Sequence, residues 1–348
     1  MSKKFGIIFG GESFEHEISV VSAITLKKVL SSFELEFVFL SSNREFFLID
    51  SKDMKSNFFS SGGYKKSKKL TVEKNGFFQS GLLGKKKVEV DCFINLIHGA
   101  DGEDGKIASL MEFYDIDFIG PRIEASVLSF NKLFTKFYAK EIGVKTLDYQ
   151  HIKSRDGLKL KFDYPVIVKP LRLGSSIGVG VVKDKDELEY ALDVAFEFDN
   201  EVLIEPFIKN VHEYNLAGCK TKKMNLSIIE KPQKDEFLDF DKKYLDFSRS
   251  SKPTAAPVSP KIKNEIESSF EKLYANLFDG SLIRCDFFVI DDEVYLNEIN
   301  PIPGSMANYL FEDFGSIILE LSNNLPKRKK ITIDYLYINK IQSSKGKV

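Results

Sequence analysis

The chain has 348 residues, with 50 Lys and Arg against 51 Asp and Glu, a net charge of -1 and a pI near 6.5. This length predicts roughly two domains, with room for a small third, and a core that needs no disulfide or structural metal. The near-neutral charge disfavours nucleic-acid binding, because such domains usually have a pI above about 9. No apolar run approaches the roughly 18 residues of a membrane span, and the N-terminal apolar run is too short for a signal peptide. We therefore expect a cytoplasmic protein without membrane insertion.

The first 121 residues alternate apolar, strand-like runs with helix-like stretches, which predicts an open parallel α/β sheet. The predicted strands are 5–9, 36–41, 91–98 and 117–120, and the predicted helices are 16–30 and 106–116. Residues 43–90 are rich in Lys, Ser, Gly and Phe, and we interpret them as an antiparallel insertion into this domain.

A second unit, residues 122–208, is predicted to be a compact α+β domain. It begins with a long helical stretch over 124–143, and it contains a further helix over 184–199 and strands at 146–152, 164–170, 179–183 and 201–208. The third unit, 209–348, has predicted strands at 213–220 and 223–231, a helix at 261–278 and a hairpin at 281–300. The irregular stretch between Pro232 and Pro260 is long enough to suggest a functional or disordered segment. The basic tail, 326–348, is interpreted as solvated charge, with an anionic partner as the less favoured reading.

The three cysteines, Cys92, Cys219 and Cys285, are far apart, and each lies in an apolar, strand-like run. We expect reduced, buried thiols.

The hairpin has the most demanding spacing of polar residues. Side chains at i and i+2 share a face of a strand, so Arg284 points with Asp286, and Glu298 points with Asn300. If residues 291–293 form a three-residue loop, Asp286 lies opposite Glu298 and all four groups converge. A two-residue turn would instead divide them between two faces. Two carboxylates and an amide oxygen suit Mg²⁺, whereas the alternative is the solvent face of an edge hairpin.

A glycine-rich segment, KPLRLGSSIGVG, follows the apolar strand that ends near Lys169. Such a turn can present backbone N–H groups to phosphate oxygens, with Ser175 and Ser176 as hydroxyl donors. A simple hairpin turn explains the glycines equally well, but a lysine at a buried strand end favours a charged ligand. Farther along, Glu205 and Glu213 flank an edge strand that could meet an adenine and a ribose, although most glutamates so placed are surface residues.

Two polar loops are predicted at the carboxyl edge of the first sheet, where open α/β sheets bind ligands. The first contains Gly10, Gly11 and Glu15, and the second is HGADGEDG, which begins at His98. Glu15 could equally be a helix-capping residue. His98 and His16 are candidate site residues, but a lone histidine in a loop is more often a hydrogen-bond partner than a catalyst.

Seven motifs occur in order along the chain: GGESFEHEISVVSA, HGADGEDGKI, VIVKPLRLGSSIGV, EVLIEPFI, KKYL, RCDFF and NEINPIPGSM. Each alone is a modest signal, but together they resemble the D-alanine:D-alanine ligases of the ATP-grasp superfamily, over about residues 4–320. The resemblance implies an ATP-grasp fold behind the N-terminal α/β domain. It also implies a homodimer that phosphorylates one D-alanine with ATP and joins it to a second, for peptidoglycan precursor synthesis.

The resemblance also implies roles for residues. Glu15 would bind the first D-alanine ammonium, with Ser175 and Tyr244 linked to it, and Arg284 would stabilise the oxyanion. Asp286, Glu298 and Asn300 would hold two Mg²⁺ or Mn²⁺ ions. The implied ATP-binding residues are Lys132, Lys169, Ser176, Glu205, Phe207, Ile208, Glu213 and Lys243, and the implied substrate-binding residues are His98, Gly304 and Ser305.

The stretch 232–250 would be a lid over the site, because an acyl phosphate must be kept from water. Tyr244 favours an amine rather than a D-lactate nucleophile. A second lid tyrosine of the family is replaced here by Leu238 or Phe240, and Ser305 would replace a family serine at a different spacing. Two alternatives stay open: a ligase for another amino acid or for a D-alanine:D-lactate pair, and a nucleotide-binding regulatory module without activity.

Overall fold

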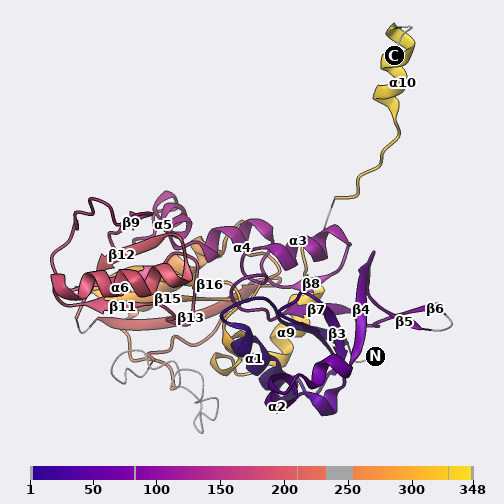
Figure 1. Ribbon diagram of the computed structural model, residues 1–348, viewed down its shortest axis with the longest axis horizontal. Helices are drawn as coiled ribbons and strands as arrows, with labels where there is room; N and C mark the ends of the chain where they lie inside the picture. Colours follow the sequence, from indigo (N-terminus) through magenta and orange to yellow (C-terminus); the bar gives the residue numbers. More distant parts are fainter. Residues whose placement is uncertain (1–2, 82–83, 210, 233–253, 328, 346–348) are drawn as a thin grey trace.

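The computed structural model describes residues 3–81, 84–209, 211–232, 254–327 and 329–345. Three β-sheets follow one another along the chain, and each is covered by helices (Figure 1). No helix within the described ranges is long and apolar enough to cross a membrane.

The first sheet has eight strands in the order β6-β5-β4-β3-β2-β1-β7-β8. Its parallel part is the predicted α/β unit: β1 (Lys4–Gly10), β2 (Glu34–Leu40), β7 (Cys92–Asn95) and β8 (Phe118–Ile119). The predicted insertion continues the same sheet in antiparallel fashion, as β3 (Phe46–Ile49), β4 (Lys68–Glu73), β5 (Gly76–Gly81) and β6 (Gly84–Lys87).

Helices cover both faces of this sheet. On one face α1 (His16–Val29) packs with Phe5 and Ile7, and on the other α3 (Lys106–Phe113) packs with Ile8. The insertion adds three short turns of helix: η1 (Ser51–Asp53), α2 (Ser56–Ser60) and η2 (Gly63–Lys66).

The long helix expected over 124–143 is two helices, α4 (Ile123–Phe130) and α5 (Lys132–Glu141). Asn131 separates them with extended backbone, and its side chain accepts hydrogen bonds from the N–H groups of Leu133 and Phe134 at 3.0 and 3.2 Å. An asparagine that caps a helix in this way ends the preceding one, because its own backbone leaves the helical region.

The second sheet is antiparallel, in the order β11-β10-β12-β9, with α6 (Lys185–Phe198) against one face. Its strands are β9 (Gln150–Ile152), β10 (Val166–Pro170), β11 (Gly180–Val182) and β12 (Val202–Pro206). Asp184 caps α6 by accepting hydrogen bonds from Asp186 and Glu187 N–H groups.

The third sheet is also antiparallel, in the order β14-β13-β15-β16. It comprises β13 (His212–Lys220), β14 (Met224–Leu226), β15 (Ile283–Ile290) and β16 (Glu293–Asn300). Alternate residues such as Leu216, Cys285 and Ile299 pack in one core with α8 (Pro260–Tyr274). The opposite face therefore carries the polar members of the hairpin, Arg284, Asp286, Glu298 and Asn300.

The hairpin between β15 and β16 has a two-residue turn, so the expected three-residue loop is wrong. Asp291 and Asp292 form the turn, both with positive φ, and Ile290 pairs with Glu293. The expected pairs, Asp286 with Glu298 and Arg284 with Asn300, nevertheless form, because the register shifts by one residue between Asp286 and Phe287. Asn297 is the extra residue of this β-bulge, a feature common beside active sites.

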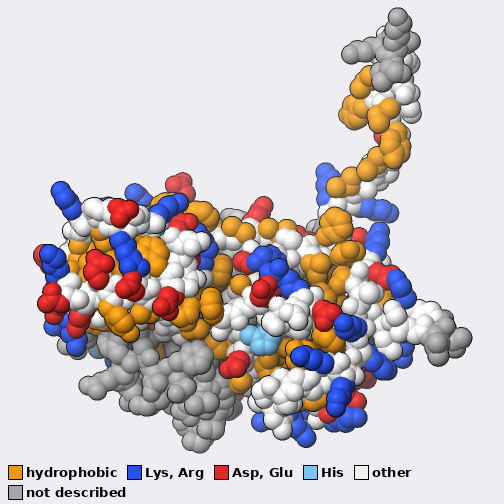
Figure 2. Space-filling model, in the orientation of Figure 1, with side chains coloured by type: hydrophobic (Ala, Val, Ile, Leu, Met, Phe, Trp, Pro, Cys, Tyr) orange, Lys and Arg blue, Asp and Glu red, His pale blue; other side chains and the backbone are white. Residues whose placement is uncertain are grey.

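After the hairpin the chain returns to the first sheet. The turn η3 (Gly304–Leu310) and helix α9 (Phe314–Asn323) share a hydrophobic core with β1 and α1. Beyond it the tail leads to α10 (Leu336–Lys345), which extends away from the body (Figure 1). Figure 2 shows blue and orange side chains along this tail, and residues 329–344 are all exposed. The three cysteines are buried and free, as predicted.

Candidate active site

Glu15 immediately precedes α1 but does not cap it. Its carboxylate instead reaches the glycine-rich turn of the second sheet, where it accepts hydrogen bonds from the Ser175 hydroxyl and, at 3.3 Å, from the Gly174 N–H. Burial, followed by the nearby Glu103, raises the pKa of Glu15. Among the described residues Glu15 makes no ion pair. Its carboxylate is therefore buried between α1 and the glycine-rich turn without a paired lysine or arginine from the described ranges.

His98 lies three residues after the end of β7, close enough to Glu15 for the two side chains to interact electrostatically. Its Nε2 is 3.0 Å from the Ser22 hydroxyl, and its Nδ1 is 3.6 Å from a carboxylate oxygen of Glu103. Burial lowers the pKa of His98 to about 4, so the ring is neutral at physiological pH. By contrast, His16 Nδ1 bonds to the Gly11 carbonyl at 2.6 Å, and its ring packs edge-on against Phe39. These contacts agree with the alternative given for His16 from the sequence, a hydrogen-bond partner rather than a catalyst.

Glu103, in the HGADGEDG loop, is a site residue that the sequence reasoning did not select. It lines the same pocket as Lys132 and Glu298, and its backbone N–H donates to the Gly99 carbonyl at 2.7 Å. Burial raises the pKa of Glu103 to about 8. The signal was available, because this glutamate follows His98 in a polar loop already assigned to the edge of the sheet.

The glycine-rich turn joins β10 to β11, and both of its serines have left-handed backbone, with φ of 56° at Ser175 and 59° at Ser176. Non-glycine residues in this region are uncommon and cluster at ligand-binding turns. The Lys132 ammonium donates to the Leu173 carbonyl at the start of this turn, and burial lowers the pKa of Lys132. The turn thus contacts both Lys132, through the Leu173 carbonyl, and Glu15, through the Ser175 hydroxyl.

Glu205 is held between two lysines. Its Oε2 lies 2.6 Å from Lys169 Nζ and its Oε1 lies 2.6 Å from Lys136 Nζ. Burial alone would raise the pKa of Glu205, but the two lysines outweigh it and hold the pKa at about 2. Lys136 was not predicted, although it follows Lys132 by four residues and so lies on the same helix face. Lys169 also donates to Asn297 Oδ1 of the bulge at 3.4 Å, which ties the second sheet to the third.

The four polar groups of the hairpin lie together as expected. Asp286 accepts from Arg284 Nε at 2.7 Å, from Arg284 Nη2 at 2.8 Å and from Asn300 Nδ2 at 3.0 Å. Glu298 lies opposite Asp286 on the neighbouring strand. Burial disfavours the charge of Arg284, but Asp286 outweighs it, so the pKa of Arg284 is raised and the side chain stays cationic.

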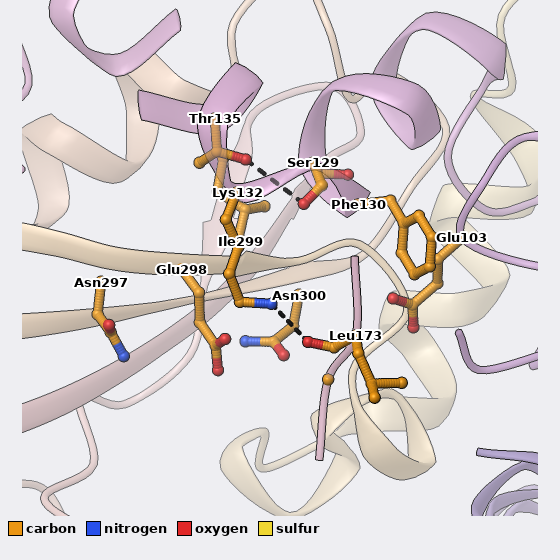
Figure 3. A pocket seen from close by; sticks show the side chains of 11 residues that line it. Glu103, Ser129, Phe130, Lys132, Thr135, Leu173, Asn297, Glu298, Ile299 and Asn300 are labelled. Carbon is orange, nitrogen blue, oxygen red and sulfur yellow. Dashed lines mark hydrogen bonds between the residues drawn. The ribbon is translucent and has the colours of Figure 1, made fainter. Parts of the chain in front are cut away.

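One pocket is lined by some of these groups, namely Glu103, Lys132, and Glu298 and Asn300 of the hairpin. Its full lining comes from the loop after β7, from α4, α5, the glycine-rich turn and β16: Glu103, Ser129, Phe130, Lys132, Thr135, Leu173, Gly174, Asn297, Glu298, Ile299 and Asn300. Figure 3 shows Lys132, Asn297, Glu298 and Asn300 pointing into the same space, with Glu103 on the opposite side. Among the described residues, no three His, Cys, Asp or Glu side chains converge on a point that could hold a metal ion. The metal ligands expected from the resemblance, Asp286, Glu298 and Asn300, comprise two carboxylates and an amide.

The other predicted site residues either do not line this pocket or lie outside the described ranges. Phe207 and Ile208 follow β12, and the Phe207 N–H donates a hydrogen bond to the Pro165 carbonyl at 3.0 Å. Glu213 is on β13, where it lies opposite Phe288 of β15. Ser305 is buried, and a side chain at Gly304 would meet nothing within 4 Å. Four residues of the expected lid lie outside the described residues: Lys243, Tyr244, Leu238 and Phe240.

Two family models match the chain. Residues 4–121 match the D-ala D-ala ligase N-terminus, and residues 139–315 match the D-ala D-ala ligase C-terminus. The chain belongs to the D-alanine–D-alanine ligase family. The similarity extends to whole relatives: a D-alanine–D-alanine ligase of Sulfurovum sp. is 59% identical over 341 residues, covering 98% of this chain and 99% of the relative. One of Campylobacter concisus is 60% identical over 342 residues, covering 98% of each.

A solved structure agrees with the sequence comparisons. The D-alanine–D-alanine ligase of Helicobacter pylori superposes with a TM-score of 0.84 and 51% identity, covering 94% of this chain and 100% of that chain. The predicted ATP-grasp fold with an N-terminal α/β domain is therefore confirmed. Glu15 and the hairpin lie within the two matched ranges, whereas Lys132 falls between them.

Proposed function

We propose that this chain joins two D-alanine molecules into D-alanyl-D-alanine, converting ATP to ADP and phosphate. The observation that supports it most directly is the pairing state of the buried carboxylates. Glu205 is neutralised by Lys136 and Lys169, and Asp286 by Arg284, whereas Glu15 makes no ion pair among the described residues. A buried carboxylate without a cation favours a cationic ligand, and the ammonium of an amino acid meets that need.

The proposed reaction proceeds in two steps. A carboxylate oxygen of the first D-alanine attacks the γ-phosphorus of ATP, which gives an acyl phosphate and ADP. The amine of the second D-alanine then attacks the acyl carbon, phosphate leaves with its electron pair, and the amine loses a proton. Catalysis of phosphoryl transfer depends on positioning and on cations around the spread negative charge.

The candidate site residues fit these demands. Lys132 and Lys169 would lie along the phosphates, Ser175 and Ser176 would offer donors from the glycine-rich turn, and Arg284 would face the oxyanion. An oxyanion donor of this kind is typically worth about 2.7–4 kcal/mol of barrier. We propose that the two D-alanine molecules bind next to Glu15, His98, Arg284 and Gly304, and we call this proposed binding region the amino-acid cleft.

The hairpin fits Mg²⁺ or Mn²⁺ by the chemistry of its donors, since Asp286, Glu298 and Asn300 offer hard oxygens from two rigid, adjacent strands. A divalent ion bound there would neutralise phosphate charge. In the structure Arg284 and Asn300 already donate to Asp286, so these donors hold the carboxylate in place on the strand.

The proposal is tested by supplying the purified chain with ATP, Mg²⁺ and a panel of single amino acids and D-lactate, and by measuring phosphate release. We expect release to depend on D-alanine, with D-alanyl-D-alanine as the product. Release that depends on another amino acid would favour a related ligase, and no release with any of them would favour a regulatory nucleotide-binding module.

We further propose that the three sheets mark three domains, with boundaries near residues 121 and 208, and that the chain forms a homodimer. The dimer rests on the family resemblance alone, and sedimentation equilibrium of the full chain measures it.

A further inference from the structure

The hydroxyl of Ser22 lies between two sides of the amino-acid cleft. Ser22 is in the second turn of α1 and is fully buried. Its Oγ accepts a hydrogen bond from the Ser305 N–H at 3.0 Å and lies 3.0 Å from His98 Nε2. One side chain therefore joins the loop after β7 to the turn after β16, although the two are more than 200 residues apart in the chain.

One assignment of protons is consistent with the contacts among Ser305, Ser22 and His98. The Ser305 N–H can only donate, so Ser22 Oγ accepts there and can use its own hydrogen toward His98 Nε2. A neutral imidazole has one donor and one acceptor nitrogen, so the ring proton is then on Nδ1. That nitrogen faces the Glu103 carboxylate at 3.6 Å.

The turn at Ser305 needs an anchor. Ser305, Met306 and Ala307 all have left-handed backbone, with φ of 47°, 54° and 48°. Left-handed backbone is strained for residues other than glycine, and runs of it persist only where the surroundings hold them. Here the Ser22 contact fixes the first residue, while Met306 and Ala307 are buried in the core shared with α1.

We propose that Ser22 is a positioning residue for the amino-acid cleft, whose hydroxyl fixes the Nδ1–H tautomer of His98 and anchors the left-handed turn that begins at Ser305. This inference rests on the proposed function, since the cleft is defined by it. Without the hydroxyl, the buried Ser305 N–H and His98 Nε2 both lose a partner, and both borders of the cleft are free to move.

The chain offers a matched control one turn earlier on the same helix. Ser19 is also fully buried, and its Oγ accepts from the Gly10 N–H at 2.8 Å and donates to the Leu96 carbonyl at 2.6 Å. Ser19 therefore joins the end of β1 to the residue that follows β7, as Ser22 joins two loops. It makes no recorded hydrogen bond to His98 or Ser305 among the described residues.

The experiment compares full-length wild type with Ser22→Ala, Ser22→Thr and Ser19→Ala. The ¹⁵N spectrum of the imidazoles reports the tautomer of His98, and the chain has only four histidines to assign. Steady-state kinetics with ATP and D-alanine gives kcat and KM separately. Ser22→Ala should lose the Nδ1–H tautomer signature and raise the KM for D-alanine at least about tenfold, with a smaller effect on kcat.

Ser22→Thr keeps a hydroxyl and should restore both the tautomer and the KM. Ser19→Ala should lose a similar amount of stability while keeping the wild-type tautomer and KM. If Ser22→Ala does not fold, Ser22→Cys keeps the volume with a weak donor and should show the same changes.

A wild-type tautomer and KM in Ser22→Ala would overturn the inference, as would equal changes of KM in Ser19→Ala. If wild type itself shows no D-alanine-dependent turnover, the proposed function fails, whereas the tautomer of His98 in Ser22→Ala still decides whether Ser22 fixes the ring.

Discussion

At the scale of single residues, neighbours decide what each buried carboxylate does. Glu205, Asp286 and Glu15 are all at least 95% buried. Two lysines pair with Glu205, an arginine and an amide hold Asp286 on its strand, and Glu15 accepts hydrogen bonds from a hydroxyl and an N–H group. The sequence indicated that such carboxylates were present, but which of them is already paired is decided by contacts between segments far apart in the chain.

Replacing Glu298 with Gln should remove D-alanine-dependent turnover while the protein stays folded. The substitution keeps the side-chain volume but removes one of the anionic ligands proposed for the divalent ion. Turnover and the unfolding midpoint in urea measure the two expectations. Glu293→Gln, an exposed position at the other end of β16, is the matched control and should keep activity. Normal turnover in Glu298→Gln would exclude the proposed metal site.

The Glu205 ion pairs predict a pH dependence of stability. The folded pKa of Glu205, about 2, lies below its ordinary value near 4.3, so the stabilisation is present above pH about 5 and is lost as the pH falls toward 2. Its full size is on the order of 3 kcal/mol. Urea unfolding of wild type and Glu205→Gln should therefore differ most near neutral pH and converge in acid.

The exposed Glu189→Gln on α6 is the control for that series and should change the unfolding free energy by less than about 0.5 kcal/mol. A constant difference between wild type and Glu205→Gln from pH 7 to pH 3 would contradict the assigned pairing.

At the scale of elements, the sequence predicted most strands and helices but missed two local irregularities. Periodicity placed β1, α1 and α8 well, because their apolar residues repeat at the expected spacing. The bulge was missed, although Leu296 and Ile299 are three residues apart and both face the core. In a regular strand, residues three apart point to opposite faces, so two core-facing residues at this spacing require one extra residue between them. That residue is Asn297, and its insertion places Glu298 opposite Asp286.

The division between α4 and α5 is the second irregularity, and it gives a testable prediction. Asn131→Ala removes the side chain that caps α5 and should lower the unfolding free energy by about 0.5–2 kcal/mol. Lys132 begins this helix, so turnover should fall as well. Asn131→Ser keeps a capping oxygen and should recover most of both losses. An Asn131→Ala protein as stable as wild type would show that the cap does not hold this boundary.

At the scale of the whole molecule, loops that follow strands of the first two sheets and strand β16 of the third sheet line one pocket, and the chain returns to the first sheet through η3 and α9. The sequence predicted three units and their order, since each has its own pattern of strands and helices. It did not predict that residues 304–323 share the core of the first unit, because packing between distant segments leaves no periodic signal.

The exposed tail gives a prediction at this scale. A chain that ends after Lys327 should match the full chain in unfolding free energy to within about 0.5 kcal/mol, and in turnover, because residues 329–344 are exposed. Thermal unfolding and phosphate release measure both. A large loss of activity on truncation would mean that the tail contributes to the active assembly.

The most direct test of the central claim follows oxygen through the reaction. D-alanine labelled with ¹⁸O in its carboxylate is incubated with the full chain, ATP and Mg²⁺, and the released phosphate is analysed by mass spectrometry. If the carboxylate is phosphorylated and then attacked by an amine, one labelled oxygen appears in the phosphate for each D-alanyl-D-alanine formed. Phosphate without the label, or ATP hydrolysis without dipeptide, would contradict the account.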